Sequence, residues 1–164
     1  MQSFLLPLEQ RQYYMRGKSK LVLAARKKGF RSVIEHKIAR QIELEGNTVR
    51  YETIKIEWVD YAVRTYTPDF ILDNGIIIEV KGRWVAHDRN KHLEIRKQHP
   101  HLDIRIVFEN QNNKLYKNSK TSYALWCVRK DIVYANRVIP QSWLKESGQP
   151  LPPTRTKVIG QLIK

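Results

Sequence analysis

Isoleucines recur every fourth position from Ile34 to Ile42, a spacing that places them on one face of a helix. Ser32 and Glu35 stand three residues apart at the start of this stripe and fit a capping box. Gly46 follows the stripe and is a natural residue for the turn that closes a helix. The pattern therefore predicts a helix that begins after Ser32 and ends before Gly46.

Residues 49–66 are rich in β-branched and aromatic side chains. Apolar and charged side chains alternate over 54–58, as in a half-buried strand. The apolar positions then shift by one residue, to Tyr61 and Val63. Because such a shift moves side chains to the other face, a bend or bulge is expected near 59–60.

A hairpin is predicted next. Asp69–Leu72 and Ile76–Val80 each fit a strand, and Asp73-Asn74-Gly75 between them tolerates the positive φ of a tight turn. Three consecutive isoleucines open the second strand, which indicates burial on both faces. We therefore expect it to lie in the middle of a sheet.

Over the rest of the chain, helical and strand-like hydrophobic patterns follow one another. Together with the elements above, they predict an α/β fold with a mixed central sheet flanked by helices. The expected elements are a helix over 88–98 stopped by Pro100, a buried strand over 104–108, a short strand over 114–116, a helix over 122–130 and a short helical turn through Trp143 and Leu144.

Charge narrows the function. The 164 residues carry 30 Lys and Arg against 16 Asp and Glu, a net charge of +14. Such an excess indicates an anionic partner, and nucleic acid is the first candidate. An anionic membrane surface is the weaker candidate, because no long amphipathic helix pairs a basic face with Trp and Leu. No stretch approaches the roughly 18 apolar residues of a membrane span.

Half of the excess charge, net +7, lies in residues 1–31. We expect a mobile or partly ordered basic arm over 1–30, helical near 21–25, followed by a folded domain over 31–147 and a tail over 148–164. The plain alternative for the arm is a solvated tail. Phosphate contact is favoured because charges this dense repel one another unless a polyanion neutralises them.

Cys127 is the single cysteine and cannot form an intrachain disulfide. It is expected to be a small buried residue rather than a nucleophile. The first residues lack the basic region of a signal peptide. These features predict a reducing cytoplasm, that of the host cell if a phage encodes the chain.

The candidate chemistry lies in the predicted hairpin. Pro68-Asp69 precedes its first strand and Glu79-Val80-Lys81 ends its second, which is the PD…(D/E)xK arrangement of metal-dependent nucleases. Neighbouring strands can bring both carboxylates to one end of the sheet, where they suit Mg²⁺ or Mn²⁺. Lys81 lies two residues after Glu79 and shares its face, so its ammonium can orient water or offset phosphate charge.

Plainer explanations exist for each residue. Pro68-Asp69 fits a turn that starts a strand, and Glu79 with Lys81 fits an exposed ion pair worth about 0.5 kcal/mol. Against this, Glu79 follows three isoleucines, where a bare carboxylate is costly without a cation. Glu35 is explained by the capping box alone, although its position also allows it to reach a site at the sheet edge.

The five histidines have no zinc-ligand spacing. His99 and His101 flank the predicted helix stop and are expected at the surface. His87 is the histidine nearest to the proposed site in sequence.

The motif residues stand in a longer pattern. Residues 65–70, Asn74-Gly75-Ile76 and Glu79-x-Lys81-Gly82 closely resemble phage endodeoxyribonuclease I, the family of four-way (Holliday) junction resolving enzymes within the PD-(D/E)xK superfamily. The likeness runs from Phe30 to Glu146 and includes 91–93, 98–100, 102–108, 114–117 and 121–123.

The resemblance implies a restriction-endonuclease-like core in an intertwined, domain-swapped homodimer that cuts branched DNA with two Mg²⁺ per active site. Glu35, Asp69 and Glu79 would bind metal, Lys81 would act beside them, and Glu35 would come from the other subunit. The strand over 54–66 would bridge the subunits, although it lacks the family's prolines and is slightly shorter. The basic arm is longer than in the family.

The predicted function is therefore metal-dependent cleavage of four-way junctions. The alternatives are another nickase of the same superfamily, of the repair or transposon-end type, and a non-catalytic architectural DNA-binding protein. Candidate phosphate contacts are Arg16, Lys18, Lys20, Arg26, Lys27, Lys28, Arg31, Arg83, Arg89, Lys91 and Lys97.

Overall fold

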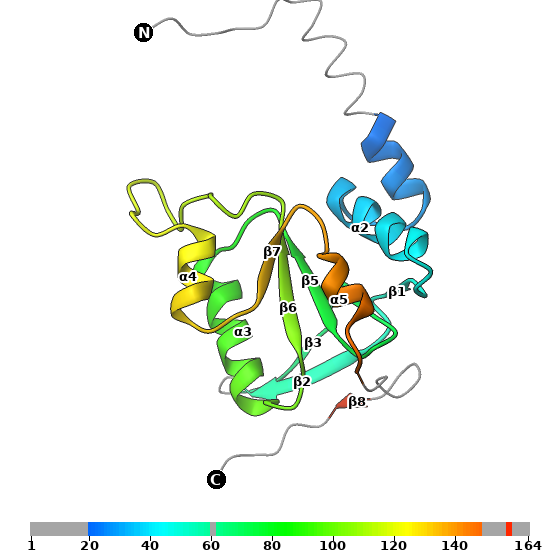
Figure 1. Ribbon diagram of the computed structural model, residues 1–164. Helices are drawn as coiled ribbons and strands as arrows, with labels where there is room; N and C mark the ends of the chain where they lie inside the picture. Colours follow the sequence, from blue (N-terminus) through cyan, green and yellow to red (C-terminus); the bar gives the residue numbers. More distant parts are fainter. Residues whose placement is uncertain (1–19, 60–61, 149–156, 159–164) are drawn as a thin grey trace, which may run out of the picture. The chain divides into compact units, whose positions relative to one another are not determined.

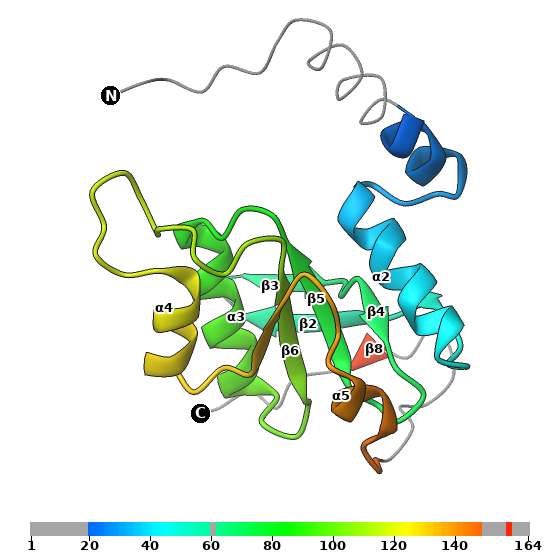
Figure 2. The same cartoon turned by 45° about the horizontal axis from the view of Figure 1, so that its top comes forward.

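The computed structural model describes residues 20–59, 62–148 and 157–158, drawn in colour in Figures 1 and 2. The chain divides into two compact units, one up to Lys37 and one from Ile38 onward. The helices are α2 (Val33–Leu44), α3 (Ala86–Gln98), α4 (Tyr123–Arg129) and α5 (Gln141–Lys145). The strands are β1 (Arg50–Tyr51), β2 (Lys55–Val59), β3 (Val63–Tyr66), β4 (Phe70–Ile71), β5 (Ile77–Lys81), β6 (Ile104–Phe108), β7 (Tyr134–Asn136) and β8 (Lys157–Val158).

The N-terminal unit contains a helical segment, 20–27, which extends the predicted helical stretch. Gly29 then takes φ +85°, and the Phe30 N–H donates to Ala25 O at 3.0 Å to close the turn. The Phe30 ring stacks on His36 with centroids 5.7 Å apart. The basic arm therefore includes at least one ordered helical turn before α2.

The capping box at the start of α2 is confirmed. Ser32 Oγ accepts the Glu35 N–H at 3.2 Å and donates to Glu35 Oε1 at 2.7 Å. Glu35 Oε2 accepts the backbone N–H of Arg31 at 2.9 Å rather than that of Ser32. Beyond the end of the helix, Gly46 has φ +77°, as a helix-closing glycine does.

A five-stranded mixed sheet, in the order β1-β4-β5-β6-β7, forms the centre of the second unit. β4 runs antiparallel to β1 and β5, whereas β6 runs parallel to β5 and β7. The predicted hairpin is confirmed: Gly75 has φ +86° and Leu72 N donates to Ile76 O at 2.8 Å. β5 lies in the middle, as its isoleucines predicted.

Segment 54–66 differs from the prediction of a single bent strand. It forms two strands, β2 and β3, which pair antiparallel with Ile56 opposite Tyr66 and Val59 opposite Val63. The shift in apolar positions therefore marks a reversal of the chain rather than a bulge. β8 from the predicted tail adds to this second sheet, parallel to β2. The bridge between subunits that was expected of this segment stays a prediction.

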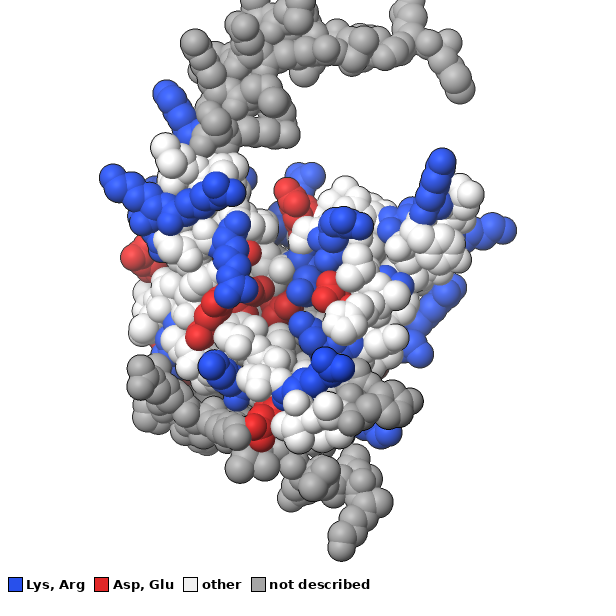
Figure 3. Space-filling view, turned by 180° about the vertical axis from the view of Figure 1, so that it is seen from behind, with Lys and Arg blue, Asp and Glu red and all other residues white. Residues whose placement is uncertain are grey.

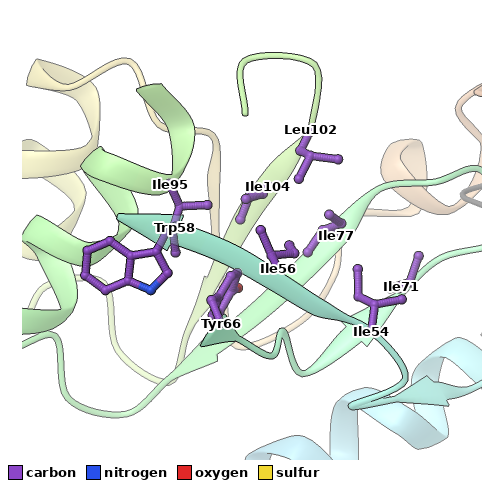
Figure 4. Close-up of a cluster of buried hydrophobic side chains, with 9 residues drawn as sticks. All are labelled: Ile54, Ile56, Trp58, Tyr66, Ile71, Ile77, Ile95, Leu102 and Ile104. Atoms are coloured by element: carbon purple, nitrogen blue, oxygen red, sulfur yellow. The ribbon is translucent and has the colours of Figure 1, made fainter. Parts of the chain in front are cut away.

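The apolar core lies between the two sheets. Ile54, Ile56 and Trp58 of the β2 segment belong to one cluster with residues of the five-stranded sheet, and Figure 4 shows Ile56 beside Ile77 and Ile104. α3 and α4 lie side by side in both ribbon views (Figures 1 and 2). A second cluster joins them to the sheet and contains Trp84, Ile106, Phe108, Tyr123, Cys127 and Ile132. Cys127 is buried as predicted, and burial raises its pKa to about 12.

Four further elements differ from the sequence prediction. The expected strand over 114–116 is only an isolated bridge between Lys114 and Ser122, because the surrounding loop is polar and turns at Asn118 with φ +100°. α3 begins at Ala86, two residues earlier than expected. β1 and β7 were not predicted, since strands of two and three residues carry little periodicity.

A charged group fastens α5 to the sheet. Arg105 of β6 is buried and donates to both Asp103 and Glu146 at 2.5–3.1 Å. Its guanidinium lies 5.0 Å from the centroid of the Trp143 ring. Within the described ranges, no helix is long and apolar enough to span a membrane.

Candidate active site

The sheet register brings Asp69, Glu79 and Lys81 together. Ile71 pairs with Ile77 across the antiparallel β4–β5 ladder, and continuing this register places Asp69 opposite Glu79 on the same face. Lys81 shares that face because it lies two residues further along β5. Asp69 Oδ2 accepts the Val80 N–H at 2.7 Å, which fixes the first carboxylate against the second strand.

Glu79 is a buried carboxylate, 4% exposed. Its Oε1 lies 2.6 Å from Lys81 Nζ, and its Oε2 accepts the Tyr66 hydroxyl at 2.6 Å. Burial alone raises the pKa of Glu79, but His92 and Lys81 outweigh that effect and lower it to about 2. The carboxylate is therefore ionised, and the alternative of an exposed ion pair is wrong.

Lys81 stays positively charged in this setting. Burial lowers its pKa, but Glu79 and then the carboxylates of Asp88 and Asp69 raise it, and the net direction is upward. The contribution of Asp69 indicates that both acids of the motif act on the one ammonium. This arrangement is the one that the Glu-x-Lys spacing predicted.

Tyr66 supports Glu79 from the second sheet. Its side chain is buried on β3, and burial followed by the charge of Glu79 raises its pKa well above the usual value. The phenol therefore stays protonated and remains a hydrogen-bond donor. The sequence placed Tyr66 in the bridge segment and gave no sign of this contact, which depends on packing between distant strands.

His92 is the second neighbour that sequence reasoning missed. It is 1% exposed, its Nε2 lies 3.6 Å from Glu79 Oε1, and its ring contacts Tyr66 and Trp84. Burial lowers the pKa of His92, so the imidazole is neutral near pH 7 and the charge that balances Glu79 belongs to Lys81. Among the described residues, neither ring nitrogen has a hydrogen-bond partner.

The histidine predictions need correction. His87, the expected neighbour of the site, is exposed. His99, expected at the surface, is fully buried with Nε2 2.6 Å from Glu57 O, whereas His101 is exposed as predicted. The available signal was helical spacing, because His92, Ile95 and His99 lie on one face of α3.

Lys91 also approaches the acids from α3. It is half-buried, and its Nζ lies 4.8 Å from the centroid of the Tyr66 ring. Burial lowers its pKa, and the charges of Glu79, Lys81, Asp88 and Asp69 all act on it. Lys91 thus belongs to the site itself rather than to a distant surface.

The other predicted phosphate contacts differ in their exposure and in their partners within the protein. Arg16 and Lys18 lie outside the described residues. Arg89 is half-buried, donates to Trp84 O and lies 5.9 Å over the Trp126 ring, which is a structural role. Figure 3 shows basic side chains over much of one face of the molecule. The fully exposed candidates are Lys20, Arg26, Lys27, Lys28, Arg31, Arg83 and Lys97.

The donor set fits a hard divalent cation in part. Asp69 and Glu79 supply carboxylate oxygens on one face of the sheet, which is the chemistry that Mg²⁺ prefers. Across the described parts of the chain, no three His, Cys, Asp or Glu side chains gather as a metal site. Glu35 is described within the N-terminal unit, so its part in a metal site stays a prediction.

The model of the phage endonuclease I family matches residues 15–161. The chain belongs to this family. Endonuclease I of Escherichia phage T7 is 49% identical over 129 residues, which cover 78% of this chain and 87% of that relative. Endodeoxyribonuclease 1 of Enterobacteria phage T3 is 47% identical over 126 residues, 76% and 83% of the two chains. The family resemblance and the prediction of an endonuclease are confirmed.

Proposed function

We propose that this member of the phage endonuclease I family cleaves four-way junctions and other branched DNA by Mg²⁺-dependent phosphodiester hydrolysis. The name of the T3 relative, an endodeoxyribonuclease, supports DNA as the substrate. The observation that carries the proposal is the buried, ionised Glu79, held beside Asp69 and paired with the Lys81 ammonium at 2.6 Å. Buried, strongly perturbed ionisable groups of this kind cluster at functional sites.

Asp69, Glu79 and Glu35 would hold Mg²⁺, with Mn²⁺ as a substitute and two ions per site. Bound there, the metal would activate water and neutralise charge on the phosphate. Asp69 is fixed by the Val80 N–H, and Glu79 is fixed by the Tyr66 hydroxyl, so both carboxylates are oriented before substrate arrives. This preorganisation avoids the reorganisation that would otherwise slow the reaction.

Lys81 would act on the water or on the phosphate. Its ammonium rests on Glu79 Oε1 at the open end of β5, and a small side-chain rotation would direct it to an incoming phosphate oxygen. In-line attack would leave 5′-phosphate and 3′-hydroxyl ends. The neutral His92 packs behind Glu79 and excludes water from that side of the carboxylate.

Branch selectivity would come from a homodimer with a restriction-endonuclease-like core and two basic channels. The net charge of +14 supports contacts mainly to phosphate, which carry shape rather than sequence information. In this proposal the 54–66 segment bridges two subunits, and Glu35 acts with Asp69 and Glu79 of the other chain. Light scattering tests whether the protein is a dimer. A monomer at micromolar concentration would rule out the bridging segment and the sharing of Glu35 between subunits.

The decisive experiment incubates the purified protein with a synthetic four-way junction and, separately, with its duplex arms. We expect cleavage of the junction in Mg²⁺, little cleavage of duplex, and binding without cleavage in Ca²⁺. Asp69→Ala should abolish cleavage and retain junction affinity. Equal cutting of duplex would favour a nickase, and a parent protein that binds without cutting would favour an architectural role.

Glu35 needs a separate test because it also caps α2. Glu35→Gln keeps a side chain that serves in a capping box, whereas Ser32→Ala removes the cap at a cost of about 1 kcal/mol. A metal-binding Glu35 predicts that the first variant loses cleavage and the second keeps it. Full cleavage by Glu35→Gln would mean that Glu35 caps α2 and does not bind metal.

A further inference from the structure

We infer that Lys91 forms an anion subsite inside the active site and binds the scissile phosphate of the DNA. This inference rests on the proposed nuclease function and adds a second ammonium to the single lysine of the Glu-x-Lys motif. It is drawn from the position of Lys91, the absence of a partner for its charge, and the chemistry of the groups around it.

The position follows from α3. Lys91 immediately precedes the buried His92, so the helix turn that presses His92 against Glu79 also directs Lys91 to the same end of the sheet. Its Nζ lies 4.8 Å from the centroid of the Tyr66 ring, and the hydroxyl of that ring bonds Glu79 at 2.6 Å. One aromatic ring therefore separates the Lys91 ammonium from the catalytic carboxylate.

The ammonium lacks an anionic partner. Within the described ranges, Lys91 forms no ion pair and no hydrogen bond, and its one polar contact is with the face of the Tyr66 ring. The charge of Glu79 acts on Lys91, but the two carboxylate oxygens contact Lys81 and the Tyr66 hydroxyl, and Glu79 forms no ion pair with Lys91. Half-burying an ammonium costs solvation that a cation–π contact offsets only in part.

The missing partner is an anion that enters from solvent. Lys81 pairs with Glu79 at 2.6 Å, whereas Lys91 forms an ion pair with no carboxylate of the described residues, although the charges of Glu79, Asp88 and Asp69 act on it. A phosphodiester brings one negative charge and two non-bridging oxygens, and lysine meets such oxygens as a point charge. Held on the Tyr66 ring, Lys91 would contact one of these oxygens and stabilise the charge that grows on it during attack.

The alternative is that Lys91 only packs on Tyr66. Lys91→Met and Lys91→Arg separate the two, because methionine keeps the packing and arginine keeps the charge. Lys145→Met is the matched control, since Lys145 is an exposed lysine of helix α5 and is not a predicted phosphate contact. Single-turnover cleavage of a junction in Mg²⁺ and junction affinity in Ca²⁺ are measured for each protein.

We expect Lys91→Met to slow single-turnover cleavage about 100-fold, as does loss of one oxyanion contact, while junction affinity falls less than about tenfold. Lys91→Arg should recover part of the rate. Lys145→Met should leave both junction affinity and the cleavage rate unchanged. Equal rates in Lys91→Met and Lys145→Met would overturn the inference, because packing alone would then explain Lys91.

A sulfur substitution tests the contact directly. Junctions that carry sulfur at one or the other non-bridging position of the scissile phosphate are compared in both proteins. One of the two substitutions should slow the parent protein but add little in Lys91→Met, because the affected contact is already gone. Unchanged sulfur effects in the variant, for both positions, would reject the contact.

The sulfur effect is the ratio of the cleavage rates of the unmodified and the sulfur-substituted junction, measured with one protein preparation. This ratio does not depend on how much of the variant folds, because both substrates meet the same preparation. The failure of the inference is also distinct from failure of the nuclease proposal. A parent protein that cleaves junctions, with a variant that matches it, removes only the role of Lys91. A parent protein that does not cleave removes both.

Discussion

Two buried charged groups lie on opposite faces of the same sheet, and they are built differently. The Arg105 cluster (Arg105, Asp103, Glu146 and Trp143) satisfies its buried cation with two carboxylates and an aromatic face. The Glu79 cluster (Asp69, Glu79, Lys81, Tyr66, Lys91 and His92) leaves the Lys91 ammonium without an anion and both nitrogens of His92 without partners. The first group is satisfied by its own side chains, whereas the second contains polar groups that no described residue satisfies.

The difference extends to the surrounding polar atoms. Among the described residues, five buried side-chain atoms lack hydrogen-bond partners, and three of them belong to His92 and Trp84 beside Glu79. None belongs to the Arg105 cluster. Unsatisfied buried groups usually mark a site where function rather than stability set the structure. This contrast supports the proposal that the Arg105 cluster is a structural clamp and that the Glu79 cluster is the reactive centre.

Removing the charge of Glu79 should have the largest effect. Glu79→Gln keeps the size of the side chain and the Tyr66 contact but loses a metal ligand and the partner of Lys81. We expect the cleavage rate in Mg²⁺ to fall about 1,000-fold or more, with junction affinity in Ca²⁺ retained. A cleavage rate within tenfold of the parent rate would show that the Glu79 carboxylate is not required for cleavage, and the proposed difference between the two clusters would be lost.

Removing the Tyr66 hydroxyl should have a smaller effect on the same cluster. Tyr66→Phe keeps the ring under Lys91 but frees Glu79 Oε2, and loss of such an orienting contact typically costs about 10- to 100-fold in activity or metal affinity. We expect a higher Mg²⁺ concentration for half-maximal cleavage. Tyr134→Phe on β7 is the control and should not shift that concentration, whereas equal shifts would argue for a general packing effect.

Breaking the Arg105 cluster should affect stability and not chemistry. Arg105→Met leaves Asp103 and Glu146 unpaired, but both are about half exposed, so we expect a loss of about 1–3 kcal/mol in urea unfolding. The folded variant should cleave at the parent rate. A slower rate with unchanged stability would contradict the division between the two clusters.

Acid should weaken the Glu79 cluster in a defined range. The folded pKa of Glu79 is lowered from 4.5 to about 2, so its ionisation stabilises the fold above pH 4.5. That contribution should fall as the pH drops from about 4.5 to about 2, where the carboxylate takes up a proton. Unfolding free energies over this range should therefore fall less steeply for Glu79→Gln than for the parent, and parallel curves would contradict the assignment.

The elements that depend on short stretches of sequence were predicted correctly. The turn at Asn74-Gly75 and the alternation along β5 determine where Asp69, Glu79 and Lys81 lie, and their juxtaposition followed from spacing alone. The buried strand over 104–108 and the cap of α2 followed in the same way.

Contacts between segments that are distant in the sequence could not be predicted. Tyr66 and His92 meet Glu79 only because β3 and α3 pack on one face of the sheet, and no spacing rule encodes that packing. The chain reversal within 54–66 was read as a bulge because both produce the same shift of apolar positions. Glu35 illustrates a different limit, since its capping contacts lie within its own unit and give no sign of a role in a metal site.

The central claim is that Asp69 and Glu79 bind a divalent cation together. Crystals grown with Mn²⁺ and a four-way junction, measured at a wavelength that reveals manganese, test it most directly. The account predicts an anomalous peak about 2.1 Å from oxygens of both carboxylates, with the Lys81 ammonium near the scissile phosphate. A peak bound by neither carboxylate, or no peak in a complex that cleaves when Mg²⁺ is added, would contradict it.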